Sequence, residues 1–166
     1  MERRMRAWIS FLAALGLASL ACGMARRPRT PAPAKEGKMT DVSDLTVTDV
    51  SPSRWSGAYC SSEEPGAVLV KDAQAWAGLW KKDFDKEAPP VDFSKYFAVA
   101  VFAGLRNTGG FSVELLAPSA SDSEVAIGYR IKSPAPGAFV TMAFTQPFAV
   151  QLYRKTALPV KLEERR

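Results

Sequence analysis

The sequence contains no histidine and only two cysteines among its 166 residues. Without an imidazole, the chain cannot form a Ser-His-Asp or Cys-His catalytic pair or a His-Glu-x-x-His zinc site. Two cysteines are too few for a thiolate metal cluster, and no Walker phosphate loop or Gly-x-Gly-x-x-Gly turn occurs. We therefore expect no metal site, no cofactor and no enzymatic activity.

Carboxylates are the catalytic groups that the composition still allows. The visible pairs are Asp83 with Asp85 and Glu63 with Glu64, in charge-rich, turn-like stretches that are typical of a solvated surface. A hydrolase that uses one of these carboxylate pairs remains a hypothesis, ranked after the two binding hypotheses given below. It requires two acidic side chains that converge in a cleft, about 5–10 Å apart.

The net charge of +5 does not indicate a nucleic-acid partner, because the excess lies near the N-terminus. Residues 1–40 contain eight lysines and arginines against two glutamates, whereas residues 41–166 contain 14 against 15 acidic residues. The region that folds carries no net attraction for phosphates.

The N-terminus has the layout of an export signal, with arginines followed by an apolar run over 7–21 and then Cys22. Fifteen helical residues span about 22 Å, less than the ~30 Å of a bilayer core, so we expect residues 1–21 to be a cleaved signal peptide. Residues 17–22, Leu-Ala-Ser-Leu-Ala-Cys, resemble the lipobox of bacterial lipoproteins. This resemblance implies lipidation of Cys22, although Ser19 stands where leucine is usual, and soluble secretion is the alternative.

Residues 22–44 are rich in proline and basic residues and lack an apolar period, which predicts a flexible tether. About 20 residues at ~3 Å each would hold the domain up to ~60 Å from the lipid surface. The lipobox resemblance also implies an outer-membrane or cell-surface location, because Gly23 is not the aspartate that commonly retains lipoproteins at the inner membrane. Cys60 would then be the remaining thiol, which we expect to be a small buried group beside Tyr59.

From residue 45 onward, short runs of alternating apolar residues predict one β-rich domain over 45–166. The run 97–103 is apolar on both faces and predicts a central strand, whereas Pro159 marks 158–162 as an edge strand. Asp72 can cap a helix that places Trp76 and Trp80 on one face. We expect an α+β fold, mainly antiparallel, with one packed helix and about eight short strands from the segments 45–50, 55–60, 66–71, 97–103, 111–115, 125–131, 138–144, 147–154 and 158–162.

The loop 104–111, Gly-Leu-Arg-Asn-Thr-Gly-Gly-Phe, has the most specific chemistry in the chain. Its two adjacent glycines predict a tight hairpin with positive φ. The turn does not require Arg106, which could pair with a carboxylate of a partner. The candidate partner-binding residues are Arg106, Asn107, Thr108, Phe111 and, as a further aromatic anchor, Trp55.

The same region carries a family resemblance. The Val-Asp-Phe-Ser-Lys run at 91–95 and the loop 104–111, with the helix of Trp76 and Trp80 and the strand from Thr145, resemble the C-terminal domain family of PrcB, an accessory subunit of a spirochaete cell-surface protease complex. The similarity covers roughly residues 55–155 and implies a lipoprotein that stabilises or helps assemble a protease without cleaving peptides itself.

Two binding hypotheses follow. The first is a non-catalytic exported lipoprotein domain that binds and stabilises an envelope or surface protein, such as a protease. The second is an envelope module that binds a small ligand or glycan between sheet and helix through Trp76, Trp80 and Tyr96.

Overall fold

A computed structural model describes residues 45–166. The expected signal peptide 1–21, Cys22 and the tether 22–44 lie outside the described residues. Within the described part, no helix is both long and apolar enough to cross a membrane.

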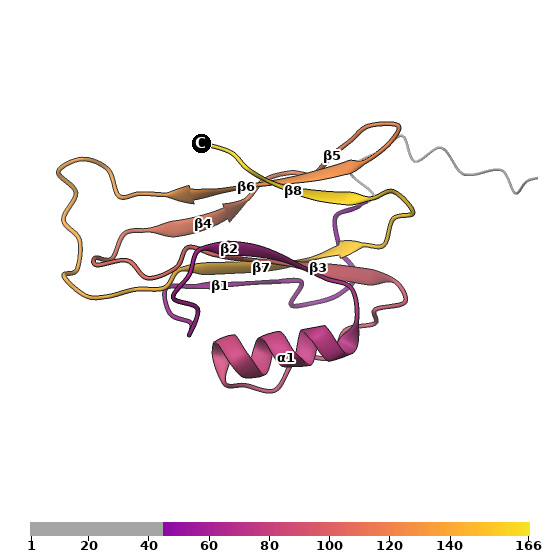
Figure 1. Ribbon diagram of the computed structural model, residues 1–166, viewed down its shortest axis with the longest axis horizontal. Coiled ribbons are helices and arrows are strands. Elements are labelled where there is room, and N and C mark those ends of the chain that lie inside the picture. The colour runs from indigo at the N-terminus through magenta and orange to yellow at the C-terminus, as the bar shows by residue number, and fades with distance from the viewer. Residues whose placement is uncertain (1–44) are drawn as a thin grey trace, which may run out of the picture. The chain divides into compact units, whose positions relative to one another are not determined.

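The described residues form three layers (Figure 1): two β-sheets face each other, and one helix covers the outer face of one sheet. The first sheet has the strand order β1-β7-β3-β2, and the second has β4 and β5 on one side of β6 and β8 on the other. This is the expected α+β fold. The elements are β1 (Arg54–Gly57), β2 (Gly66–Val70), α1 (Ala73–Phe84), β3 (Tyr96–Phe102), β4 (Ser112–Leu115), β5 (Ser119–Ala120), β6 (Val125–Lys132), β7 (Phe148–Arg154) and β8 (Val160–Glu164).

Strand β3 lies at the centre of the fold, and all seven of its residues are buried. Alternate side chains, among them Val99 and Val101, face the second sheet, whereas Ala98 and Ala100 face the helix. An antiparallel strand that is covered on both faces needs apolar residues at every position. The prediction of a central strand here is confirmed.

Helix α1 begins at the expected cap, where the Asp72 carboxylate accepts a hydrogen bond from the Ala75 amide at 2.8 Å. It ends at Asp85, which adopts the left-handed conformation with φ 50°. The helix buries Trp76, Leu79 and Trp80 against the first sheet, so this prediction also holds.

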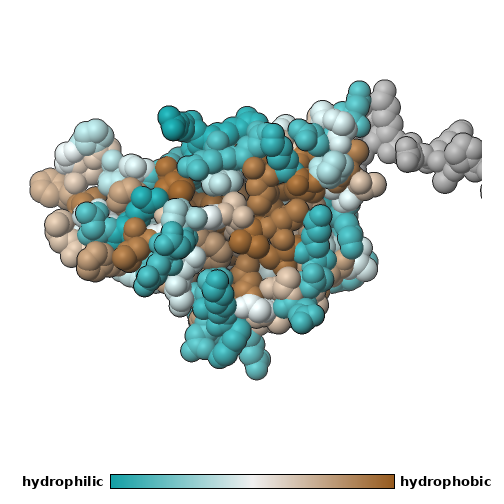
Figure 2. Space-filling model, viewed as in Figure 1, coloured by the Kyte–Doolittle hydropathy of each residue, from teal (hydrophilic) through white to brown (hydrophobic). Residues whose placement is uncertain are grey.

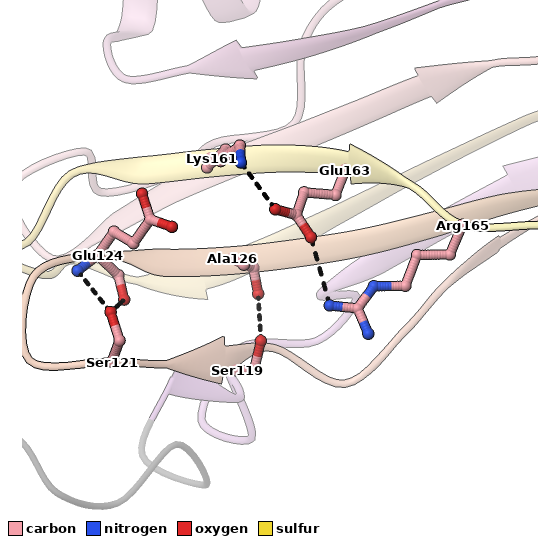
Figure 3. Close-up of polar contacts among 7 residues, drawn as sticks. All are labelled: Ser119, Ser121, Glu124, Ala126, Lys161, Glu163 and Arg165. Carbon is pink, nitrogen blue, oxygen red and sulfur yellow. Dashed lines mark hydrogen bonds and ion pairs between the residues drawn. The ribbon is translucent and has the colours of Figure 1, made fainter.

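Strand β8 is an edge strand, as Pro159 predicted, and it pairs with β6 in parallel. Its side chains Lys161 and Glu163 form an ion pair at 3.0 Å, and Arg165 approaches Glu163 at 3.4 Å (Figure 3). Charged side chains and a proline discourage another chain from adding to a free edge. This edge of the second sheet is therefore protected against unwanted pairing.

Two expected strands are absent. In 45–50, only Thr46 pairs, with Tyr153 of β7, and the amide of the adjacent β7 residue, Leu152, donates to the Ser53 carbonyl just before β1 instead. Residues 138–144 form no strand and instead belong to a long loop between β6 and β7. Conversely, the two-residue strand β5 was not predicted, and Ser121 closes its turn to β6 through hydrogen bonds with the backbone of Glu124 (Figure 3).

Candidate protein-binding surface

Two loops meet at one end of the fold (Figure 1): residues 103–111 connect β3 to β4, and residues 133–147 connect β6 to β7. The expected hairpin over 104–111 is wrong, because β3 pairs with β2 and β7 while β4 pairs with β6. The first loop therefore crosses from one sheet to the other, and its hydrogen-bonding partner is the second loop.

Four hydrogen bonds join residues 106–109 of the first loop to residues 141–145 of the second. The Arg106 amide donates to the Thr145 carbonyl at 2.7 Å, and the Thr145 amide donates to the Arg106 carbonyl at 2.9 Å. The buried Thr145 hydroxyl donates to the Thr108 carbonyl at 2.9 Å, and the Gly109 amide donates to the Thr141 carbonyl at 2.8 Å. These bonds fix the two loop backbones against each other.

The two glycines of the first loop allow this close approach. Gly110 has φ +84°, and a Cβ there would lie 2.8 Å from Val140 Cγ1 and 2.9 Å from Pro134 Cβ. The expectation of positive φ holds for Gly110. Gly109 does not have a positive φ; it is buried directly beneath Thr141.

The joined loops expose an unusual amount of apolar surface. Of the six large hydrophobic side chains that are exposed within 45–166, four lie here: Leu105 at 46%, Phe139 at 106%, Met142 at 86% and Phe144 at 68%. Residues 133–147 contain no charged side chain. Figure 2 shows tan and brown surface at this end. We call these four side chains the apolar tip.

Arg106 lies at the base of the tip and is half-buried. Its guanidinium carbon stands 5.2 Å from the centre of the Phe111 ring, within the range of a cation–π interaction. Its Nε is buried and has no hydrogen-bond partner within 45–166. Arg106 therefore packs on Phe111 instead of projecting freely from the loop.

The structure brings together four of the five candidate residues. Arg106, Asn107, Thr108 and Phe111 share the first loop, where Asn107 is exposed and Thr108 half-buried. Trp55 lies elsewhere, on β1, with its ring 5.6 Å from those of Trp76 and Trp80 on the helix side of the first sheet.

Phe139, Met142 and Phe144 were not predicted to be exposed, because the apolar run 138–144 was interpreted as a strand. A charge-free stretch of fifteen residues that begins with Ser-Pro-Ala-Pro-Gly was the available signal. Such a segment has turn residues where a strand would start and no polar face to present to solvent.

The expected ligand pocket between sheet and helix is not formed as predicted, because Trp76 and Tyr96 are packed. The Trp76 indole donates to the Pro89 carbonyl at 2.8 Å, and the Tyr96 hydroxyl donates to Asp49 at 2.6 Å. A hollow of about 600 Å³ opens instead beside the last turns of α1, where Trp55, Tyr59, Trp80 and Asp83 line it. We call it the helix-end hollow.

The two candidate acidic pairs do not converge in a cleft. Asp83 is buried, whereas the Asp85 side chain is 81% exposed and pairs with Lys81. Glu63 and Glu64 are both exposed. Within 45–166, neither pair has the arrangement that a glycoside hydrolase needs.

Cys60 is a free, half-buried thiol. Its sulfur donates to the Gln146 carbonyl at 3.2 Å, and burial raises the pKa of the thiol. At neutral pH the group is therefore protonated and poorly nucleophilic, which suits a packing role.

Residues 97–151 match the family model described as PrcB C-terminal. The match runs from β3 into β7 and includes both loops of the apolar tip. No curated protein and no solved structure matches the chain. The resemblance is thus confirmed over the segment that builds the tip.

Proposed function

We propose that this chain, whose residues 97–151 match the PrcB C-terminal family model, is a non-catalytic exported lipoprotein domain that binds an envelope or surface protein and stabilises it or helps to assemble it. The observation that carries the proposal is the apolar tip, which is fixed in place and left uncovered within 45–166.

The composition of the tip supports a protein contact. Phenylalanine, methionine and arginine are enriched at the centres of protein interfaces, where most charged residues are depleted. Two of the exposed tip residues are phenylalanines and one is a methionine, with Arg106 beneath them as the one charged residue of the two loops. A loop that merely connected two sheets would be expected to carry polar side chains instead.

The rigidity of the tip also supports binding, because hydrogen bonds between the loops reduce the entropy that is lost on association. Full burial of one large apolar side chain gains about 1.5–3 kcal/mol, so four gain about 6–12 kcal/mol. Association costs about 4–15 kcal/mol. The tip alone therefore gives weak binding, and additional polar contacts around it must supply the rest.

The partner that fits is an exported protein with an apolar groove and a carboxylate at its rim to receive Arg106. The family resemblance makes the protease of an envelope protease complex the first partner to test. Lipidation of Cys22 would anchor the domain at the outer membrane or cell surface, close to such a partner.

The test is affinity purification of the tagged full-length protein from detergent-solubilised envelope, followed by mass spectrometry. We expect one stoichiometric exported protein, and we expect Phe139→Ser with Phe144→Ser to abolish its recovery. Tyr59→Ser is the matched control, because Tyr59 is 66% exposed, close to the 68% of Phe144, but lies outside the tip.

Since all three side chains are exposed, none of these substitutions should lower the melting temperature appreciably. Recovery of the domain alone, even after mild crosslinking, would overturn the proposal. Equal loss of the partner in the Tyr59 control would also count against the tip. If the tip variants instead lose binding to lipid vesicles in a Cys22→Ala background, the tip contacts the membrane and the protein-docking proposal fails.

A further inference from the structure

The helix-end hollow is a second candidate site that shares no residue with the apolar tip. It lies between β1, the segment that follows β1 and the last turns of α1. Its volume of about 600 Å³ falls in the usual range for small-molecule sites, roughly 300–1,000 Å³. Its lining includes Arg54, Trp55, Tyr59, Trp80, Asp83 and Lys86.

Asp83 is the unusual member of this lining. It is only 6% exposed and forms no ion pair within 45–166, yet its carboxylate oxygens are not among the fully buried atoms that lack a hydrogen-bond partner. Burial raises the pKa of Asp83, and the nearby Lys82 opposes this shift only in part. A carboxylate that lines a hollow and forms no ion pair within 45–166 can accept hydrogen bonds from a ligand there.

Aromatic rings form the apolar part of the hollow. The Trp55 and Trp80 rings lie 5.6 Å apart at an interplanar angle of 80°, so they give the wall two differently oriented faces. Tyr59 stands at the rim with 66% of its surface exposed. A ligand in this hollow must therefore present an apolar face as well as polar groups.

The charges around the hollow argue against a ligand with a strong charge of either sign. Arg54 and Lys86 are cationic, whereas Asp83 is acidic, so hydrogen-bond donors and an acceptor stand around the same space. A hydroxyl group can donate to a carboxylate and accept from an ammonium or guanidinium group. A sugar ring combines several hydroxyls with apolar C–H faces.

We propose that the helix-end hollow binds an uncharged saccharide, whose hydroxyls donate to Asp83 and whose ring stacks on Trp55 and Tyr59. This site does not depend on the docking role of the apolar tip, and either proposal can fail alone.

The test titrates the full-length protein, in a detergent without sugar head groups, with chitotriose, cellotriose and maltotriose in turn. Binding is measured by tryptophan fluorescence and by calorimetry. We expect saturable binding of at least one trisaccharide, and the preferred one distinguishes N-acetylated from plain sugars. Tyr59→Ala and Asp83→Leu should each weaken it about ten- to a hundredfold.

Two measurements separate binding from folding. Asp83→Leu should leave the melting temperature unchanged or higher, because it removes a largely buried carboxylate that forms no ion pair within 45–166. Asp85→Asn, two residues further along and outside the hollow, should leave saccharide binding unchanged. Should Asp83→Leu fail to fold, Tyr59→Ala still tests the site, since its ring is exposed. Absence of saturable binding of all three sugars, or binding that neither variant weakens, would overturn the proposal.

Discussion

Two carboxyl groups of this fold, those of Asp83 and Glu114, lie in very different surroundings. Asp83 is buried and forms no ion pair within 45–166, whereas Glu114 on β4 accepts from Arg130 at 2.6 Å and from Lys132 at 2.8 Å. The hydrogen bonds from Lys132 and Arg130 lower the pKa of Glu114 to about 2. Since Val113 and Leu115 face the core, this ion network lies on the outer face of the second sheet.

The lowered pKa of Glu114 predicts a pH dependence of stability. A group whose folded pKa lies below its unfolded value stabilises the fold above the unfolded pKa and loses that effect as the pH falls. The contribution of Glu114 should therefore be complete above pH 4.5 and disappear towards pH 2. Because the side chain is partly solvated, we expect a modest effect.

Thermal unfolding of the wild type and Glu114→Gln at a series of pH values measures this contribution. The wild type should melt at the higher temperature at neutral pH, and the two curves should converge as the pH approaches 2. A difference that is constant over this range would contradict the assignment to Glu114 ionisation. Glu124→Gln serves as a control, because no ion pair holds Glu124 within 45–166.

At the scale of single elements, helix α1 tolerates a glycine that it does not need. Gly78 is exposed in the middle of the helix, and a Cβ there would meet nothing within 4 Å. Glycine in a helix interior costs about 0.5–1 kcal/mol relative to alanine, because it has more backbone freedom to lose on folding.

Gly78→Ala should therefore raise the free energy of unfolding by about 0.5–1 kcal/mol, as measured by urea denaturation. Gly137→Ala is the matched contrast, since its Cβ also meets nothing within 4 Å but its φ is +77°. The same substitution should destabilise there by about 1–2 kcal/mol. If both substitutions changed the free energy of unfolding in the same direction, backbone conformation would not determine the effect of alanine at these two positions.

Elements with strong local signals were predictable from the sequence. The cap at Asp72 and the tryptophans four residues apart define α1, and the double-sided apolar run defines β3. In contrast, the alternation at 138–144 predicted a strand that does not form. Alternation describes which side chains share a face but does not supply the neighbouring strand that must pair with them.

Of the two loops that form the candidate site, only the first, residues 103–111, was predictable from the sequence. Arg106 and the two glycines stand out in the sequence because a turn explains the glycines but not the arginine. That this loop pairs with residues 141–145 depends on contacts between distant segments, which no local pattern reports. Asp83 was considered only in a pair with Asp85, and Trp80 only with Trp76 and Tyr96, because the hollow that both residues line arises from the packing of β1 and the segment after it.

At the scale of the whole molecule, the proposed function depends on an anchor that holds the domain at a membrane. Cys22→Ala should abolish incorporation of radiolabelled palmitate and move the protein from the membrane fraction to the soluble fraction. A single missing thiol should leave the tip and its partner affinity unchanged once both proteins are in solution.

Fractionation of cells that express each form measures the effect, and Cys60→Ala is the matched control. Its thiol is half-buried and hydrogen-bonded, so we expect the label to remain with this variant. Labelling that survives Cys22→Ala would contradict the lipoprotein proposal and favour soluble secretion or another anchor.

The position of β7 has a consequence for the proposed export of the chain. In its sheet β7 lies between β1 and β3, yet it follows both by many residues, and β8 joins the other sheet later still (Figure 1). A chain that emerges from its N-terminus cannot close either sheet until these late strands have appeared. The long chain segments that separate β7 and β8 from earlier strands must loop back before these strands can pair. Folding is therefore slow compared with that of a helical bundle. If the domain is exported as proposed, it would stay unfolded during translocation and fold after passage, so the export machinery would not need to unfold it.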